Sequence, residues 1–199
     1  MTCVVGYIDH GNKTMYMGAD SCGSNHYMHQ NRVDPKVFKK GKMLFGFTSS
    51  FRMGNLLRFK LNILSRTAKK GQKKKDLYEY MCTDFIDSVI KCLQENNYAK
   101  LEHNVVRGGV FLVATEGRLF CIEGDFQVGE VRDHYQSVGL GDGHALGALS
   151  AMDFMEETWD YKELSNISAE YKIRTALACA EKHSEGVERP FIIEKLKWR

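Results

Sequence analysis

The sequence predicts an α+β fold in which two antiparallel sheets stack face to face and a helix pair covers each outer face. Segments typical of strands come in blocks rather than alternating singly with helices, which argues against a parallel, doubly wound sheet. The strand segments "KMLFGF" and "VFLVA" are almost continuously apolar, as expected for sheets that are buried on both faces. No linker or internal repeat divides the 199 residues, so we expect one domain over residues 1–199.

The first half of the chain is expected to form two hairpins followed by two helices. Gly11 and Asn12 suit a tight turn between the first two strands. From Phe51 the apolar residues recur every three or four positions, as on one face of a helix. The polar stretch up to about residue 32 is expected to be irregular. In chain order, the expected elements are strands 3–9 and 14–19, a hairpin within 36–49 that turns at Lys40–Gly41, and helices over 51–64 and 77–94.

The second half is expected to form a meander, a further strand, two helices and a last strand. The segment "GGVFLVATEGRLFCIEGDFQVGEV" alternates apolar runs with turn residues, which is typical of a three-stranded meander. "YQSVG" is a short strand that ends in the glycine-rich turn "GLGDG", and a small-residue helix follows. That turn lacks the spacing of a phosphate-binding loop. The remaining expected elements are a helix over 169–182 and a strand in "PFIIEKL".

Composition and charge argue against several classes of function. A net charge of +3 is too small to indicate a nucleic-acid partner. The most basic run, "AKKGQKKKD", is interpreted as a solvated loop or as a dock for an acidic partner or for nucleic acid. It lacks interleaved aromatic residues, which argues against the nucleic-acid alternative. No apolar run is long enough to span a bilayer, and the first ten residues do not resemble a secretory signal. We therefore expect a cytoplasmic protein with no membrane or nucleic-acid partner.

The six cysteines and seven histidines show no spacing typical of a metal site. The chain has no C-x-x-C pair and no H-E-x-x-H motif, and His26 and His29 are expected to lie in a loop. We expect reduced, structural thiols, and neither a metal nor another cofactor.

The N-terminal residues offer a nucleophile and a base on one residue. Methionine before a small residue is commonly removed, and removal of Met1 exposes Thr2 with its hydroxyl and a free α-amine. An α-amine has a reference pKa of roughly 7.7–8.0, so a substantial share of it is neutral near pH 7 and can accept a proton. An N-terminal Thr is a recognised variant of the nucleophile–base pair. This pattern favours hydrolysis of an amide bond.

Two further residues are expected to lie beside Thr2. Asp20 follows the second strand, which runs back toward Thr2, and Lys36 comes at the start of the next strand. An ammonium near the Thr2 amine lowers the pKa of that amine by like-charge repulsion, and a carboxylate holds the ammonium in place. Each residue alone is more often a turn or surface residue, so the expectation depends on their combination.

Three segments resemble the N-terminal nucleophile hydrolases of the proteasome β-subunit and HslV type: "TCVVGYIDHGNKTMYMGADS", "KVFKKGKMLFGFTSS" and "SVGLGDGHALGAL". Members of that family begin with Thr on the first strand, carry G/A-A-D at the end of the second and K-V at the start of the third. Later in the chain an S-x-G-x-G turn enters a helix. The resemblance covers essentially the whole chain, and it implies a four-layer αββα sandwich.

The resemblance also implies roles for individual residues. In this sequence the roles fall on Thr2 as nucleophile, Asp20 as the conserved acid, Lys36 as the catalytic lysine, the backbone N–H of Ser50 (beside Ser49) as oxyanion donor, and Glu181 and Ser184 as support for the nucleophile. One position departs from the pattern, because Leu140 stands where the family has a serine in the glycine-rich turn.

The implied activity is that of an N-terminal threonine endopeptidase acting on peptides or unfolded proteins. The implied assembly is a homo-oligomeric ring, with an ATP-dependent unfoldase as a further partner. The segment "LLRFKLNILSR" favours assembly, because its apolar residues occupy more than one face of the expected helix. The alternative is a helix that packs more deeply within its own domain. Two alternatives stay open: a non-catalytic assembly or scaffold subunit of the same fold, and an amidase that acts on a small amide.

Overall fold

The computed structural model describes residues 2–24, 28–66, 74–158 and 167–198. Met1, His26 and residues 69–73 of the basic run lie outside these ranges. In chain order the elements are β1 (Cys3–Asp9), β2 (Thr14–Ala19), β3 (Cys22–Ser24), β4 (His29–Asn31), β5 (Val37–Lys40), β6 (Met43–Phe47), α1 (Phe51–Phe59), α2 (Leu77–Tyr80), a π-helical turn (Met81–Phe85), α3 (Ile86–Glu95), β7 (Lys100–Glu102), β8 (Val105–Arg107), β9 (Phe111–Thr115), β10 (Arg118–Ile122), β11 (Val128–Glu130), β12 (Tyr135–Gly139), α4 (Asp142–Thr158), α5 (Ala169–His183) and β13 (Ile192–Lys197).

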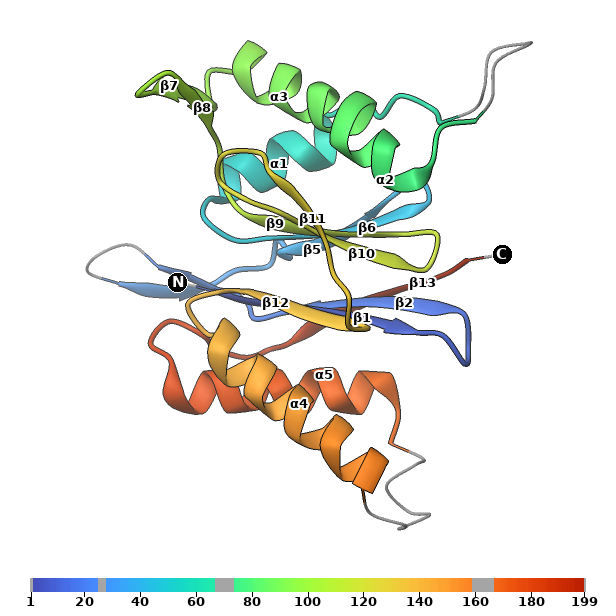
Figure 1. Ribbon diagram of the computed structural model, residues 1–199. Helices are drawn as coiled ribbons and strands as arrows, with labels where there is room; N and C mark the ends of the chain where they lie inside the picture. Colours follow the sequence, from blue (N-terminus) through green and yellow to red (C-terminus); the bar gives the residue numbers. More distant parts are fainter. Residues whose placement is uncertain (1, 25–27, 67–73, 159–166, 199) are drawn as a thin grey trace.

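The strands form two main antiparallel sheets, which confirms the predicted α+β class. One sheet has the order β12-β1-β2-β13 and the other has the order β11-β10-β9-β6-β5. Figure 1 shows the two sheets face to face, with α1, α2 and α3 beyond one of them and α4 and α5 beyond the other. None of the helices in the described part of the chain is long and apolar enough to cross a membrane.

Three buried apolar clusters fill the spaces between these elements. One lies between the two sheets and includes Val4, Met17 and Leu44. Gly46 allows the close contact there, because a Cβ on it would lie 2.4 Å from Val4 Cγ1. The other two clusters pack helices against the outer sheet faces. Burial on both faces explains why the central strands are almost continuously apolar.

The predicted helix from Phe51 to Leu64 is wrong beyond Phe59, where α1 ends. The backbone N–H groups of Lys60 and Leu61 both donate to the Leu56 carbonyl, which closes the helix. Leu61 lies beyond the helix and packs in the core, with 3% of its surface exposed. This apolar residue of the segment "LLRFKLNILSR" is therefore buried within its own chain. Phe59 and Leu64 remain exposed.

Two short hairpins, β3–β4 and β7–β8, were not expected from the sequence. Their strands are three residues long, and β4 and β7 are exposed throughout. Strands this short and polar lack the alternation that identifies a half-buried strand. The β3–β4 hairpin corrects the expectation of irregular structure between residues 19 and 32, and it borders the site described next.

Candidate active site

Thr2, Asp20 and Lys36 meet at one end of the β1–β2 hairpin. Val4 pairs with Ala19, which brings the residues just outside both strands to the same end of the sheet. Lys36 reaches this end from the other sheet, directly before β5. Its Nζ donates to Thr2 Oγ1 at 2.8 Å and to the two Asp20 carboxylate oxygens at 2.9 and 2.8 Å. The three donors of the ammonium are thereby used.

This cluster is shielded from solvent. Thr2 is 5% exposed, Lys36 2% and Asp20 0%. Burial lowers the pKa of Lys36 from its ordinary value, while the Asp20 carboxylate acts in the opposite direction. Asp20 also accepts hydrogen bonds from the backbone N–H groups of Cys3 and Cys22, each at 2.9 Å. The Asp20 carboxylate therefore fixes the positions of the Lys36 ammonium, of the backbone at Cys3 and of the backbone at Cys22.

Cys3, the neighbour of Thr2, carries a buried thiol. Its side chain is fully buried, and burial is the main cause that raises the pKa of the thiol to about 12. The Ser137 hydroxyl lies 3.5 Å from Cys3 Sγ and donates to the Val4 carbonyl. A neutral thiol in this setting packs as a small apolar group, in agreement with the expected structural role of the cysteines.

The turn between β6 and α1 faces Thr2 across a small pocket. Thr2, Lys36, Ser49 and Ser50 all line this pocket. Ser49 has a φ of 66°, a left-handed conformation that favours glycine. The Ser50 N–H donates to the Thr48 carbonyl at 2.7 Å. The described residues contain no partner for the backbone N–H of Ser49. The Ser49 hydroxyl accepts a hydrogen bond from the Val110 N–H at 3.1 Å.

A neighbouring hollow shares this turn. Thr48 and Ser49 line both the Thr2 pocket and a second hollow, which Glu123, Gln136 and Asp142 also line. The two hollows together could accept an extended ligand that crosses Ser49. The carboxylates give the second hollow an acidic side.

The glycine-rich turn after β12 holds the backbone of Thr2. The Gly141 N–H donates to the Thr2 carbonyl at 3.3 Å. Gly139 has a φ of +113°, and a Cβ on it would lie 2.3 Å from the same carbonyl oxygen. Leu140 between them is 57% exposed and is not among the described residues that line the Thr2 pocket. Sequence reasoning attended to Leu140 and missed the two glycines, although glycine is the residue expected where backbones approach this closely.

Replacing Gly139 with alanine is expected to displace Thr2. The added Cβ meets backbone rather than a mobile side chain, and the left-handed φ adds strain of about 1–3 kcal/mol. We expect the melting temperature to fall by about 2–12 °C, since each kcal/mol shifts it by roughly 2–4 °C in a domain of this size. Gly143→Ala is the matched control, because a Cβ there meets nothing within 4 Å. Equal melting temperatures for the two variants would contradict the close approach.

Glu181 and Ser184 are not among the described residues that line the Thr2 pocket. Glu181 binds Arg189 through an ion pair of 2.6 Å, and this pairing lowers the pKa of the Glu181 carboxyl. Ser184 directly follows α5, and its N–H donates to the Ala180 carbonyl. The ion pair with Arg189 thus gives Glu181 a structural partner.

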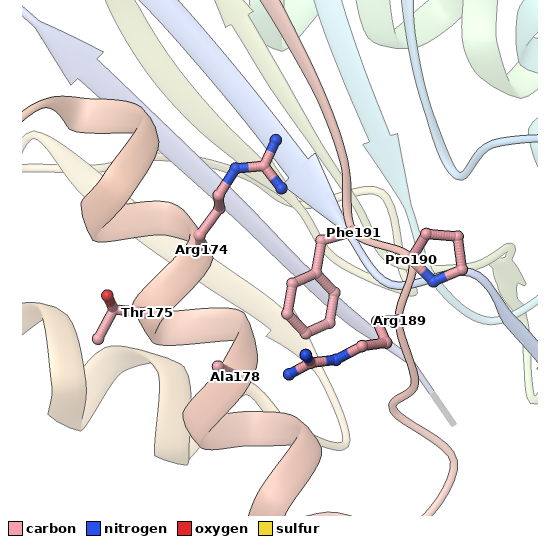
Figure 2. Close-up of a pocket in the computed structure, with 6 residues that line it drawn as sticks. All are labelled: Arg174, Thr175, Ala178, Arg189, Pro190 and Phe191. Atoms are coloured by element: carbon pink, nitrogen blue, oxygen red, sulfur yellow. The ribbon is translucent and has the colours of Figure 1, made fainter.

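Figure 2 shows a hollow elsewhere, between α5 and the segment before β13, with the Phe191 ring between the side chains of Arg174 and Arg189. Arg174 pairs with Glu170 at 3.0 Å, and Arg189 pairs with Glu181. Both guanidinium charges are therefore compensated within the chain. The described residues that line this hollow do not include a buried cluster of charged side chains like Lys36 and Asp20 beside Thr2.

Comparison with solved structures identifies the fold. BPH of Thiobacillus denitrificans in complex with epoxomicin aligns with a TM-score of 0.74 and 15% identity over 100% of both chains. A second structure of this BPH aligns with a TM-score of 0.73 and 15% identity, over 100% of this chain and 99% of that one. Eukaryotic HslV from Trypanosoma brucei aligns with a TM-score of 0.66 and 14% identity, over 99% and 100% of the two chains. No protein-family profile and no curated protein match the sequence. The chain therefore has the N-terminal nucleophile hydrolase fold of the proteasome and HslV type.

Proposed function

We propose that this protein is a threonine-type peptide hydrolase whose nucleophile is the Thr2 hydroxyl, exposed with a free α-amine when Met1 is removed. The observation that supports it best is the 2.8 Å hydrogen bond from Lys36 Nζ to Thr2 Oγ1, made inside a buried cluster with Asp20. Buried charges are costly unless they are paired, so such a cluster is a candidate functional site.

In this mechanism Thr2 Oγ forms a bond to the carbonyl carbon of the peptide, and its proton passes to the Thr2 amine. The Lys36 ammonium stabilises the negative charge that develops on Oγ, and Asp20 holds the ammonium in position. The amine proton then leaves with the amino group of the cleaved peptide. Water, deprotonated by the same amine, releases the acyl group from Thr2.

We assign the oxyanion to the turn that contains Ser49 and Ser50. The family pattern points to the Ser50 N–H, but this group already donates a hydrogen bond to the Thr48 carbonyl. The Ser49 N–H lacks a partner among the described residues and belongs to a residue that lines the Thr2 pocket. Ser49 is therefore our preferred donor, with Ser50 as its neighbour in the same turn.

The direct test is hydrolysis of fluorogenic peptides, compared with hydrolysis of small amides, by protein whose N-terminus has been defined by intact mass. Protein that has lost one methionine is expected to cleave peptides. Epoxomicin is a useful probe, since BPH of Thiobacillus denitrificans is known in complex with it. Binding of epoxomicin to the processed protein but not to the Thr2→Ala variant would support the assignment.

A non-catalytic assembly subunit is the second candidate, and Leu140 favours it. An exposed leucine at this position cannot supply the hydroxyl that the family pattern places beside the nucleophile. Native protein that retains Met1 and does not hydrolyse peptides would support this candidate. Loss of Met1 together with turnover would exclude it.

The pH profile of hydrolysis is expected to be bell-shaped. The Thr2 amine must be neutral, so activity rises with pH through a midpoint at or below the reference range of about 7.7–8.0. Lys36 must be charged, and burial lowers its pKa, so activity falls on the alkaline side before the ordinary Lys range is reached. The measurement is kcat/KM against pH. A profile that stays flat up to the ordinary Lys range would contradict the role of Lys36.

The proposal extends to architecture and assembly. We assign the stacked sheets and flanking helices to one domain, a four-layer αββα sandwich, over residues 1–199. We further propose a cytoplasmic homo-oligomeric ring that degrades peptides or unfolded proteins, served by an ATP-dependent unfoldase. Phe59 and Leu64, 73% and 52% exposed at the end of α1 and beyond it, are candidates for covered positions in such a ring.

Assembly is tested by light scattering coupled to size exclusion near neutral pH. We expect a species several times heavier than the 22.7 kDa chain. Phe59→Ser and Leu64→Ser together should shift the protein toward smaller species, because they remove exposed apolar surface without touching the core. A single species at the chain mass would contradict a stable ring.

A further inference from the structure

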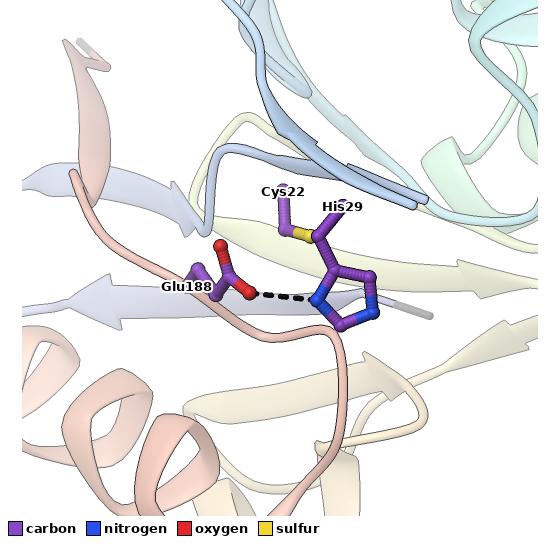
Figure 3. Close-up of side chains that lie close together, drawn as sticks. All are labelled: Cys22, His29 and Glu188. Atoms are coloured by element: carbon purple, nitrogen blue, oxygen red, sulfur yellow. Dashed lines mark hydrogen bonds and ion pairs between the residues drawn. The ribbon is translucent and has the colours of Figure 1, made fainter. Parts of the chain in front are cut away.

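Cys22, His29 and Glu188 bring three different metal-binding groups together beside the Thr2 pocket (Figure 3). One ligand atom from each residue lies within 4.8 Å of the other two. His29 Nδ1 and Glu188 Oε1 are 2.8 Å apart. Cys22 is also one of the residues that line the pocket containing Thr2.

The β3–β4 hairpin places two of these residues on one face. Cys22 pairs with Asn31, and Ser24 pairs with His29, so Cys22 and His29 are diagonal neighbours across the hairpin. Side chains in this relation lie on the same side of the ribbon and within reach of each other.

Backbone hydrogen bonds hold the third residue against the hairpin. The Ser21 N–H donates to the Glu188 carbonyl at 3.0 Å, and the Ser21 hydroxyl donates to the Pro190 carbonyl at 2.6 Å. Ser21 directly precedes Cys22 in the chain. The approach of Glu188 to Cys22 is therefore fixed by the contacts of Ser21 and does not depend on the His29–Glu188 pair alone.

We propose that Cys22, His29 and Glu188 bind a zinc ion that fastens the β3–β4 hairpin to the segment before β13. Thiolate, imidazole and carboxylate are the side-chain ligands that zinc takes in proteins, and a thiolate disfavours magnesium and calcium. Tetrahedral zinc with bonds of about 2.0–2.3 Å separates its ligand atoms by roughly 3.3–3.8 Å. In this structure His29 Nδ1 and Glu188 Oε1 are 2.8 Å apart, and all three ligand atoms lie within 4.8 Å of one another. Small side-chain rotations would therefore bring the three atoms to the separations that zinc requires.

The local electrostatics are consistent with a dication. Zinc binding releases the thiol proton, and the positive ion then lies between the Cys22 thiolate and the Glu188 carboxylate. A Cys–His nucleophile is the less favoured interpretation of the same residues, because the Cys22 thiol is buried and a nucleophilic cysteine is typically accessible to its substrate.

The test uses the full-length, reduced protein after treatment with a chelator. Zinc affinity is measured by competition with a chromophoric chelator, and stability by thermal melting. We expect one zinc per chain, and a melting temperature about 5–10 °C higher at a zinc concentration 100 times the dissociation constant. Magnesium at the same concentration should leave the melting temperature unchanged. Cobalt should give a thiolate-to-metal absorption band in the wild type.

Single substitutions assign the ligands. His29→Ala and Cys22→Ser should each weaken zinc binding by at least about 100-fold, beyond the roughly 10–100-fold loss typical of an outer-shell partner. Cys22→Ser should also lose the cobalt band, and Glu188→Gln should weaken binding at least about 10-fold. Cys179→Ser and His10→Ala are the matched controls and should bind zinc as the wild type does.

Three results would overturn the proposal: no zinc binding by the wild type, no thiolate band with cobalt, or equal zinc affinity in the His29→Ala variant. The last result is decisive because the strand that holds His29 is exposed, so this variant is expected to fold. The site does not depend on the proposed peptidase activity. The Thr2→Ala variant should therefore bind zinc as the wild type does, whether or not the wild type hydrolyses peptides.

Discussion

Replacing Thr2 with alanine is expected to abolish peptide hydrolysis while the protein stays folded. The substitution removes the nucleophilic oxygen that receives the Lys36 hydrogen bond, and it leaves the Lys36–Asp20 ion pair in place. Loss of a nucleophile costs about 10⁴-fold or more in turnover. The measurement is kcat on a fluorogenic peptide, with the melting temperature as the check on folding.

Thr2→Ser is the matched control for this experiment. Serine keeps the hydroxyl and the α-amine, so this variant should keep measurable turnover and the same dependence on removal of Met1. If the Thr2→Ala variant hydrolyses the peptide at the wild-type rate, hydrolysis takes place at another site on the molecule.

Replacing Lys36 with alanine is expected to be almost as damaging to turnover and more damaging to stability. Asp20 is completely buried, so loss of the ammonium leaves a buried carboxylate that still accepts from the Cys3 and Cys22 N–H groups but has lost its ion-pair partner. Breaking a buried pair in this way typically costs about 3–5 kcal/mol. We expect the melting temperature to fall by about 6–20 °C, measured by calorimetry beside kcat.

Two further variants separate chemistry from stability. Lys36→Arg keeps the charge but replaces a compact ammonium with a planar, bulkier group, so it should not restore turnover. Lys36→Met combined with Asp20→Asn removes both charges and should recover much of the lost stability, again without turnover. Substantial activity in Lys36→Ala or in the double variant would return Lys36 to a purely structural role.

The β1–β2 hairpin could be predicted residue by residue, while the β3–β4 hairpin could not be predicted at all. β1 and β2 have the predicted bounds, since both carry apolar runs and Gly11 and Asn12 mark the turn between them. The β3–β4 hairpin has exposed residues and no alternation, and it is tied by the hydrogen bond between Ser21 and the Glu188 carbonyl. A contact between residues so distant in the chain leaves no local pattern in the sequence.

The same distinction applies to the site. The approach of Thr2, Asp20 and Lys36 could be anticipated, because the hairpin register and the family pattern both point to it. The left-handed backbone of Ser49 could not, since a serine gives no sign of positive φ. Nor does the spacing of residues in the sequence reveal the cluster of Cys22, His29 and Glu188. Two of these residues come from the β3–β4 hairpin and the third from a segment near the end of the chain.

The strand orders leave β5 and β13 as edge strands on the same side of the stacked sheets, joined by an ion pair of 3.0 Å between Lys39 and Glu194. Open edges can recruit a strand from another chain, and charged residues, lysine above all, discourage such additions. β13 carries Lys195 and Lys197 at exposed positions, and Lys39 is exposed on β5. This side of the stacked sheets is therefore not expected to add a strand from another copy of the protein, and strand addition here would have to separate these charged side chains from solvent.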